Sequence, residues 1–521
     1  MVACGDDRAG GLDAAPHGPW RSTLYPEAWT PGMRAADGGF LHDFSYAGYR
    51  RSETALPTTW PGIVVDVTTY GAAPGATDNT AAFVAAFAAV AAAGGGVVFV
   101  PDGEYLFASN LVLDASNILL RGASRAGTKL RFSATGTAGA ASITFAGGAP
   151  PATGHVALIA DGEPQSHVVR VADPGAFQIG DHVLIDHEIT QAFIDDYGMG
   201  GIWDTGSNSA LGTRKVVLQR EVTAIAGDAI TLDVPIRTAL RVRDGAAIRR
   251  DAGVLHDCGI ESLSINNVVD PTAAAANPRA HAIELSRVRD CFVRDVASYG
   301  SSLAPVANAH LQSGGVYVVG SKRVTVADSV MANAQNHGSG GAGYGFEASA
   351  SNEVLFRDDH VESVRHGLIQ NWDFGASGLV WLRCDSSSNT LDGMITVAGR
   401  SELHHRLATA SLFDTTRDTA GFNAYNRGTE SSHAGHTATE NVFWNVAGQD
   451  LDSHLVSFQA GRGYVIGTRD LIVRVEPDAL EQLLGFADHT GPVDHLEGVD
   501  RGHELVPPSL FEDQLARRLR E

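Results

Sequence analysis

The sequence predicts an all-β solenoid, in which short strands wind into stacked coils. A pattern of apolar strand residues followed by Gly, Asn, Asp or Ser recurs from about residue 256 onward. Its starting positions are His256, Arg289, Lys322, Asn352, Ser377, Ser401 and Glu440. The first steps are 33, 33, 30, 25 and 24 residues, and self-similarity at such periods marks a repeat architecture. Alternating apolar strands with polar turns make the repeat β rather than helical, so residues one repeat apart should stack about 4.8 Å apart.

The cysteines fit this stacking. Cys258 and Cys291 are 33 residues apart, which is one repeat. We therefore expect two stacked, buried thiols rather than a disulfide. The chain has no CxxC pair, which argues against a cysteine-based zinc site.

The composition excludes some classes of protein. The chain has 521 residues, and 38 Lys+Arg against 60 Asp+Glu give a net charge of −22. This charge argues against a general nucleic-acid binder, which needs a basic surface. The 44% of hydrophobic residues is ordinary for a chain that buries a core. No apolar run reaches the roughly 18 residues of a spanning helix.

The stretch after residue 62 has the clearest local signals. It predicts a strand at Ile63–Val67, a helix at Ala81–Ala93 and a strand at Val97–Val100. Asp78 and Thr80 stand where a helix N-cap is expected. Phe83, Phe87 and Val90 recur at helical spacing and should form its buried face.

These sixty residues resemble the N-terminal signature of the pectate-lyase/polygalacturonase superfamily. The resemblance implies a right-handed, single-stranded parallel β-helix, with this segment as its cap and first coils. Where such relatives usually have a Gly-Asp-Gly loop, this chain has Ala73-Pro74-Gly75-Ala76. The motif concerns the fold and carries no chemistry.

Changes in pattern divide the chain into five parts. Residues 1–62 read as an extended arm with aromatic anchors, and residues 155–250 break the repeat with Gly-Asp turns typical of antiparallel strands. The predicted parts are an arm (1–62), a cap with the first coils (63–154), an inserted β-rich subdomain or long loops (155–250), coils bearing the groove (251–475) and a brace with short helices (476–521).

The first residues suggest export. Cys4 follows a hydrophobic and a small residue and precedes polar residues, as at the end of a bacterial lipoprotein signal. We therefore expect a lipid anchor at Cys4 and an extracellular, periplasmic or cell-surface location, although the preceding basic and apolar regions are missing. The other interpretation is a cytosolic chain with a chance cysteine.

Histidines concentrate where we expect the groove. Residues 360–440 hold six of the 20 histidines, where an even spread would place about three. The six are His360, His366, His404, His405, His433 and His436. If His404 and His405 both lie on a strand, only one of them can face the groove.

Arginine with histidine or tyrosine suits β-elimination at a uronic acid, in which a cation steadies the carboxylate while a base removes the adjacent proton. Most relatives with the N-terminal signature cleave acidic polysaccharides, so we predict a polysaccharide lyase. Its candidate catalytic residues are His366, Asp373, His404, His405, Tyr425, Arg427, His433 and His436. Its candidate substrate-binding residues are Trp372, Arg400, Arg417 and Asp392.

Three alternatives stay open. A glycoside hydrolase would use paired carboxylates among Asp373, Asp392 and Asp418. A non-catalytic glycan-binding or tailspike-like protein would use the same groove without turnover. An epimerase would share the proton abstraction.

The expected partner is an acidic polysaccharide or oligosaccharide and not nucleic acid. No cofactor is certain from the sequence, but Ca²⁺ is a candidate because carboxylates cluster on predicted turns. These carboxylates are Asp358, Asp359, Asp385 and Asp392.

Overall fold

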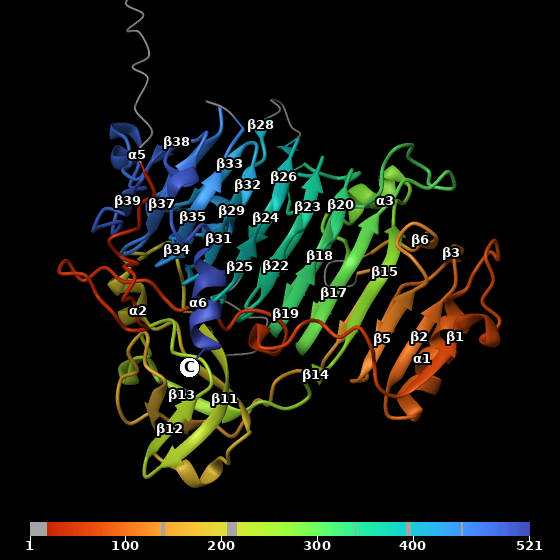
Figure 1. Ribbon diagram of the computed structural model, residues 1–521, viewed down its shortest axis with the longest axis horizontal. Helices are drawn as coiled ribbons and strands as arrows, with labels where there is room; N and C mark the ends of the chain where they lie inside the picture. The colour runs from red at the N-terminus through yellow and green to blue at the C-terminus, as the bar shows by residue number, and fades with distance from the viewer. Residues whose placement is uncertain are drawn as a thin grey trace, which may run out of the picture.

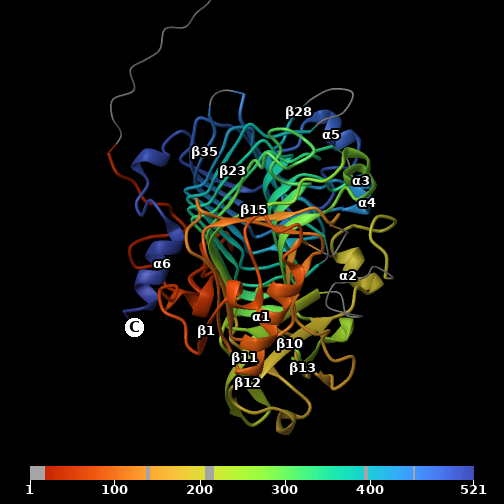
Figure 2. The same cartoon turned by 90° about the vertical axis from the view of Figure 1, so that its right-hand side faces the viewer.

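Three parallel sheets wind around one core and make a right-handed parallel β-helix, as the sequence predicts (Figures 1 and 2). The computed structural model describes residues 18–136, 141–205, 216–338, 340–372, 374–391, 397–449 and 452–520. Figure 1 shows the coils crossing the molecule from β1 and α1 at one end to β39 and α5 at the other. No helix in the described ranges is both long and apolar enough to span a membrane.

The first sheet runs the whole length of the solenoid. Its strands are β1 (Ile63–Asp66), β2 (Gly96–Val100), β5 (Ile118–Gly122), β14 (Leu255–His256), β15 (Gly259–Asn266), β17 (Val288–Ser298), β19 (Lys322–Ala327), β22 (Leu355–Arg357), β25 (Val380–Leu382), β31 (Leu412–Asp414), β35 (Val442–Ala447), β37 (Tyr464–Arg469) and β39 (His495–Glu497). The long strands β15, β17 and β35 bend around a corner and continue into the second sheet.

The second and third sheets complete each coil. The second adds β3 (Gly103–Phe107), β6 (Thr128–Phe132), β20 (Val330–Ala332), β23 (His360–Glu362), β26 (Asp385–Ser387) and β32 (Arg417–Asp418). The third is β4 (Leu111–Leu113), β7 (Ile143–Ala146), β16 (His281–Ser286), β18 (Gly314–Val319), β21 (Tyr344–Ser349), β24 (His366–Gln370), β29 (Ser401–Leu403), β33 (Gly421–Ala424), β36 (His454–Ser457) and β38 (Ile472–Arg474). Short pairs form between β27 (Thr390–Leu391) and β28 (Val397–Ala398), and between β30 (Ala408–Thr409) and β34 (Ala438–Thr439).

One predicted repeat start is wrong. In the first sheet Val380 pairs with Leu412, and Leu412 pairs with Val442. The coil after Ser377 therefore returns to this sheet near residue 411 and not at Ser401. The segment from Ser401 resembles a repeat because it is also a strand, β29, but it belongs to the third sheet.

Stacked side chains fill the core, as a solenoid requires. Phe356, Trp381, Phe413 and Phe443 form a continuous stack on successive coils, with ring centres 5.8, 4.4 and 5.2 Å apart and planes within 9° of parallel. Cys258 and Cys291 are free and buried, and the amide of Cys258 lies 3.2 Å from the sulfur of Cys291. The prediction of stacked thiols is confirmed.

The N-terminal cap follows its local signals. Helix α1 (Thr80–Ala92) connects β1 and β2 and buries Phe83, Phe87 and Val90. The carboxylate of Asp78 accepts a hydrogen bond from the amide of Thr80 at 2.9 Å. The N-cap itself is Asn79, between the two predicted residues, and the helix begins at Thr80.

The arm and the C-terminal helix cover the outside of the first sheet. Tyr25 packs on Trp29 and on Trp444 of β35, with ring centres 4.9 and 5.8 Å away. Helix α6 (Leu510–Arg518) lies over the same sheet in Figure 2, and Asp414 accepts hydrogen bonds at its N-terminus from Ser509 and Phe511. At the end of the solenoid, α5 (Ala479–Leu483) follows β38. These segments shield strands that would otherwise be exposed edges and faces.

A six-stranded antiparallel sheet projects below the solenoid in Figure 1. Its order is β8 (Val156–Ala157), β13 (Ala247–Arg250), β10 (His182–His187), β11 (Val216–Ala226), β12 (Ala229–Leu232) and β9 (Val168–Arg170). The segment between β10 and β11 contains α2 (Gln191–Asp196).

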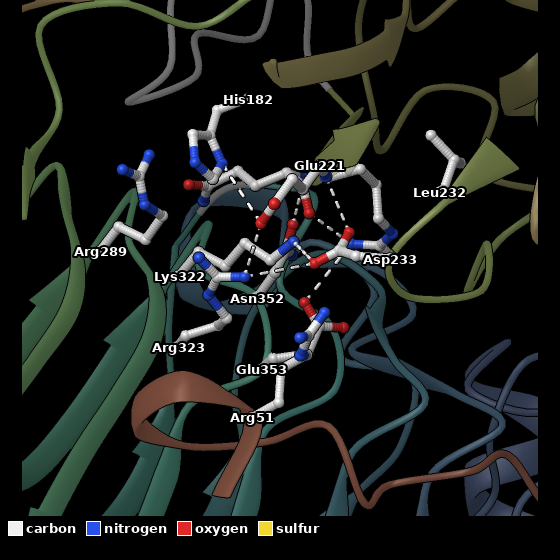
Figure 3. Close-up of polar contacts among 12 residues, drawn as sticks. Arg51, His182, Glu221, Leu232, Asp233, Arg289, Lys322, Arg323, Asn352 and Glu353 are labelled. Atoms are coloured by element: carbon white, nitrogen blue, oxygen red, sulfur yellow. Dashed lines mark hydrogen bonds and ion pairs between the residues drawn. The ribbon is translucent and has the colours of Figure 1, made fainter. Parts of the chain in front are cut away.

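Buried charges dock this sheet on the solenoid. Figure 3 shows Lys322 and Arg323 of β19 reaching Asp233 and Glu221 of the insertion. The Lys322 ammonium lies 2.7 Å from Asp233, and both side chains are buried. Such charges leave water only when they are paired.

Candidate functional site

The outer face of the third sheet collects the polar groups. Strands β21, β24, β29 and β33 lie side by side, with Tyr344 opposite His366 and Ile369 opposite Glu402. On its other side, Glu402 lies opposite Asn423 of β33. Parallel stacking therefore brings side chains from four coils to one surface. The short helices α3 (Pro271–Ala276) and α4 (Glu430–His433) lie on this side of the molecule in Figure 2.

Glu402 is the centre of the group. Its carboxylate is fully buried, and it accepts short hydrogen bonds from the Arg427 guanidinium and from Nδ1 of His404. Nε2 of His366 lies 3.2 Å from the same carboxylate. Burial opposes ionisation, but the Arg427 guanidinium above all, with the hydrogen bond from His404, holds the pKa of Glu402 well below its usual range. Glu402 is therefore a carboxylate at neutral pH.

This contact fixes the state of His404. A carboxylate can only accept, so Nδ1 of His404 carries the proton and the ring presents a lone pair at Nε2. Burial lowers the pKa of His404, so the ring is neutral near pH 7. A neutral imidazole oriented by a carboxylate is the arrangement of a general base.

A pocket of about 340 Å³ opens beside this imidazole. Its wall consists of Gly340, Gly341, Tyr344, Arg365, Asn371, Trp372, His404, His405, Ser431 and Ser432. Trp372 is 37% exposed, and its ring centre lies 4.5 Å from that of His405. An exposed indole held by a second ring is a suitable platform for a sugar ring.

Two guanidinium groups approach Tyr344. Arg279 and Arg365 each lie 5.8 Å from the centre of the Tyr344 ring. Arg279 also binds the buried carboxylate of Glu347. Among the described residues, Nη1 of Arg279 and Nε of Arg365 are buried without a hydrogen-bond partner. Such donors cost free energy unless a ligand satisfies them, which favours an anionic ligand here.

Tyr344 is a proton donor rather than an anion at this position. Burial raises its pKa to about 12, although Arg365 opposes the shift. Its ring centre is 6.3 Å from that of His404. The pocket wall thus combines a neutral base, a protonated phenol and the Arg365 cation, with Arg279 behind the Tyr344 ring.

Other pockets exist. One of about 310 Å³ lies between the arm and α6, and another of about 340 Å³ lies beside α2. Neither lining contains more than one histidine. The cluster of His366, Glu402 and His404 distinguishes the pocket on the third sheet, and within the described ranges this trio is the set of three ligands close enough to share a metal ion.

The structure brings together a large part of the predicted set. His366, His404, His405, Trp372 and Arg427 surround the pocket or its Glu402 support. Tyr425 adjoins them, with the Arg427 guanidinium 5.3 Å from its ring centre. Both His404 and His405 line the pocket, so the expectation that only one faces it is wrong. The reason is that β29 ends at Leu403. Both histidines follow the strand, so the alternation of strand side chains does not apply to them.

Other predicted residues lie apart. Arg417 is on β32 of the second sheet, where it pairs with Asp385, and His436 is fully buried. His433 is exposed on α4. Arg400 bonds the Ala420 carbonyl and the Asn423 side chain.

Most candidate carboxylates either bind residues outside the pocket or fall outside the described residues. Asp373 and Asp392 fall outside them, as does Cys4. Asp418 is buried and accepts hydrogen bonds from Ser401, Ala420 and Gly421. Among the candidate calcium ligands, Asp358 pairs with Arg383 and Asp385 with Arg417, while Asp359 is buried.

Sequence reasoning missed Glu402, Arg279, Arg365 and Tyr344 as site residues. A signal for Glu402 exists in the predicted strand, where it stands two positions before His404 and residues two apart share a face, although β29 ends between them at Leu403. Arg279 has no such signal. Coil stacking brings it to Tyr344, which is more than sixty positions later in the sequence, and no local pattern links the two.

The comparisons with known proteins agree with the scaffold. Residues 64–154 match a family model described as rhamnogalacturonase A/epimerase, pectate lyase-like. This match confirms the resemblance that the N-terminal signature indicates. Over these residues the chain is similar to pectate-lyase-like proteins. No curated protein matches the chain at a significant level.

Solved structures with similar folds are distant. The tailspike protein gp49 from Pseudomonas phage LKA1 is 14% identical, with 78% of this chain and 76% of that chain covered and a TM-score of 0.38. The AlgE6 A-module of mannuronan C-5 epimerase from Azotobacter vinelandii is 13% identical, with 80% and 76% covered and a TM-score of 0.36. The Gp54 tailspike of Acinetobacter baumannii bacteriophage AP22, in complex with capsular saccharide, is 14% identical, with 84% and 69% covered and a TM-score of 0.35.

Proposed function

We propose that this protein is a carbohydrate-active enzyme that cleaves a uronate-containing polysaccharide by β-elimination. The observation that carries the proposal is the neutral His404, held by Glu402, in a pocket that Arg365 also lines, with Nε of Arg365 buried and without a partner among the described residues. The geometry supplies a base and a cationic site for a carboxylate in one pocket.

In the proposed reaction, Arg365 and Arg279 bind the carboxylate of the uronate, which makes its C5 proton more acidic. Nε2 of His404 removes that proton, and the electron pair of the C5–H bond becomes the C4–C5 double bond. The C4–O bond breaks, and the leaving oxygen takes its electron pair together with a proton from Tyr344. Trp372 stacks on a neighbouring sugar. Solvent then restores the proton on Tyr344 and removes the one on His404.

Elimination fits the two carboxylates that hold Arg279 and His404, Glu347 and Glu402, better than hydrolysis does. A glycoside hydrolase needs one carboxylic acid that holds a proton near neutral pH. Burial opposes ionisation of Glu347, but Arg279 and His281 lower its pKa to about 2. Because Glu402 is also held ionised, neither of these two carboxylates can donate a proton. An acidic polysaccharide substrate, an exported location and a lipid anchor at Cys4 belong to the same proposal.

The test is a polysaccharide panel with two readouts, reducing ends and ultraviolet absorbance of an unsaturated uronate. We expect both signals on at least one polyuronate and neither on a neutral glucan. Reducing ends without absorbance would contradict elimination. Glycan binding without either signal would indicate a binding protein, and solvent deuterium entering an uncleaved chain would indicate an epimerase.

A variant pair ties the activity to the pocket. His404→Gln should lower kcat by a factor on the order of 10²–10⁴, the usual contribution of a general base. His503 is exposed and is not part of the pocket wall, so His503→Gln is the matched control and should retain activity.

A further inference from the structure

The trio His366, Glu402 and His404 has a feature that the proposed reaction does not use. Nδ1 of His366 lies 2.7 Å from the carbonyl oxygen of Arg400. A carbonyl can only accept, so Nδ1 carries a proton. In the neutral ring the other nitrogen, Nε2, must then present a lone pair.

That lone pair points at another electron-rich atom. Nε2 of His366 is buried, has no hydrogen-bond partner among the described residues and lies 3.2 Å from Oε1 of Glu402. Two acceptor atoms this close repel unless a proton or a metal cation lies between them. Nδ1 of His404 faces the same oxygen, and the three ligand atoms all lie within 4.8 Å of one another.

We propose that His366 Nε2, Glu402 Oε1 and His404 Nδ1 bind a transition-metal ion of the Zn²⁺ class. Two imidazole nitrogens and one carboxylate oxygen are a donor set that Zn²⁺ takes, with the fourth position open. Ca²⁺ and Mg²⁺ take oxygen ligands, so the trio selects against them.

The groups around the trio support this assignment. Metal-binding histidines commonly donate their second N–H to a backbone carbonyl, as His366 does to Arg400. Arg427 holds Oε2 of Glu402 and leaves Oε1 for the ion. His404 also lines the pocket, so an open coordination position has access to solvent or a ligand.

Binding has a chemical consequence for the proposed reaction, on which this step rests. To ligate through Nδ1, neutral His404 must move its proton from Nδ1 to Nε2 through solvent. The nitrogen that faces the pocket then carries a proton and cannot accept one from a sugar. The ion therefore inhibits the elimination, and removal of the ion restores it.

The test measures metal binding independently of activity. The full chain is stripped with a chelator and titrated with Zn²⁺ by calorimetry, and with Co²⁺ by its visible absorption. We expect one site whose affinity falls at least about 10- to 100-fold in His366→Ala and in Glu402→Gln, because even outer-shell partners of a metal cost that much. His503→Ala is the matched control and should bind as the unchanged protein does.

The outcomes separate this proposal from the proposed function. No binding by the unchanged protein, or equal binding in His366→Ala, overturns the metal site whatever the activity. If Glu402→Gln fails to fold because Arg427 loses its partner, His366→Ala still decides the result. Where elimination activity exists, stoichiometric Zn²⁺ should abolish it and chelator should restore it. Full activity of the Zn²⁺-loaded protein overturns the inhibitory step.

Discussion

At the residue scale, the chemistry of the pocket depends on which nitrogen of each histidine carries a proton. Glu402 sets this for His404, and the Arg400 carbonyl sets it for His366. Burial lowers the pKa of both rings, that of His366 to about 4. Buried groups with neighbouring charges of this kind cluster at functional sites.

The pH dependence of the reaction follows from these shifts. His404 must be neutral to act as base, and burial lowers its pKa from the ordinary 6.5. The acid limb of kcat/KM should therefore lie below pH 6.5. Burial also raises the pKa of Tyr344 to about 12, so the donor stays protonated and the profile should be flat from pH 6.5 to 9. A profile on the preferred polyuronate checks this, and an inflection above pH 6.5 would assign the base to another group.

The residues of the pocket differ in how far the sequence predicts them. His366, His404, His405, Trp372 and Arg427 stand out because histidines and arginines concentrate in one stretch. Arg279 and Glu347 come from other coils, and their approach depends on loop lengths that no local pattern encodes. The buried state of His436 is equally invisible, because a Gly- and Ser-rich segment reads as an exposed loop whether or not it is covered.

At the element scale, local signals predict the strands and α1 well, and the phase of the repeat less well. β29 has the same alternation as the strands of the first sheet, so the pattern alone does not show that the segment from Ser401 belongs to the third sheet. Corners between sheets depend on residues with positive φ, such as Asp358 and Arg383. Neither of these two residues is glycine, so the sequence does not mark that the coil turns at them.

The docking of the insertion is also an element-scale property, and it can be measured. Asp233 and Lys322 are fully buried, and Arg323 lies 3.6 Å from the same carboxylate (Figure 3). Asp233→Asn removes the negative charge that faces Lys322 and Arg323 and leaves both cations in place. We expect the free energy of unfolding in urea to fall by about 3–5 kcal/mol, which is typical when one partner of a buried pair is removed.

The double variant Asp233→Leu with Lys322→Met is the control for this experiment. It removes both charges and should recover a large part of the loss, because apolar replacement of a buried pair is often neutral. A loss below about 1 kcal/mol in Asp233→Asn would show that the insertion is held by its apolar contacts instead.

At the scale of the whole molecule, two sets of buried groups oppose each other in their effect on stability. Burial is the main cause that lowers the pKa of His42, His182, His310, His366, His404, His405 and His436. Burial likewise raises the pKa of Glu284, Asp359, Asp414, Asp418 and Asp494. The values are about 7 for Asp414 and Asp494 and about 6 for Asp418.

The sign of each effect follows from proton counting. Between about pH 4 and 6.5 the unfolded chain protonates histidines that the folded chain keeps neutral, so this set makes stability rise with pH. The buried acids hold protons that the unfolded chain has lost, so they make stability fall between about pH 4 and 7. Up to about pH 6.5, the protons that the unfolded chain gains on the seven histidines outnumber those that the folded chain keeps on the five acids, so stability rises with pH. Above that pH the histidines of the unfolded chain lose their remaining protons, so the buried acids dominate and stability should decline toward pH 7.5.

The free energy of unfolding should therefore peak near pH 6.5, and urea unfolding at pH 4.5, 6.5 and 7.5 measures this. Each titrating group contributes up to about 1.4 kcal/mol per pH unit. The decline above pH 6.5 should shrink in Asp414→Asn and in Asp494→Asn, because an amide cannot lose a proton there. Asp500→Asn is the control, since Asp500 is exposed. A decline that persists in full in both buried variants would mean that other groups cause it, and that α6 is held at Asp414 by a carboxylate that stays charged.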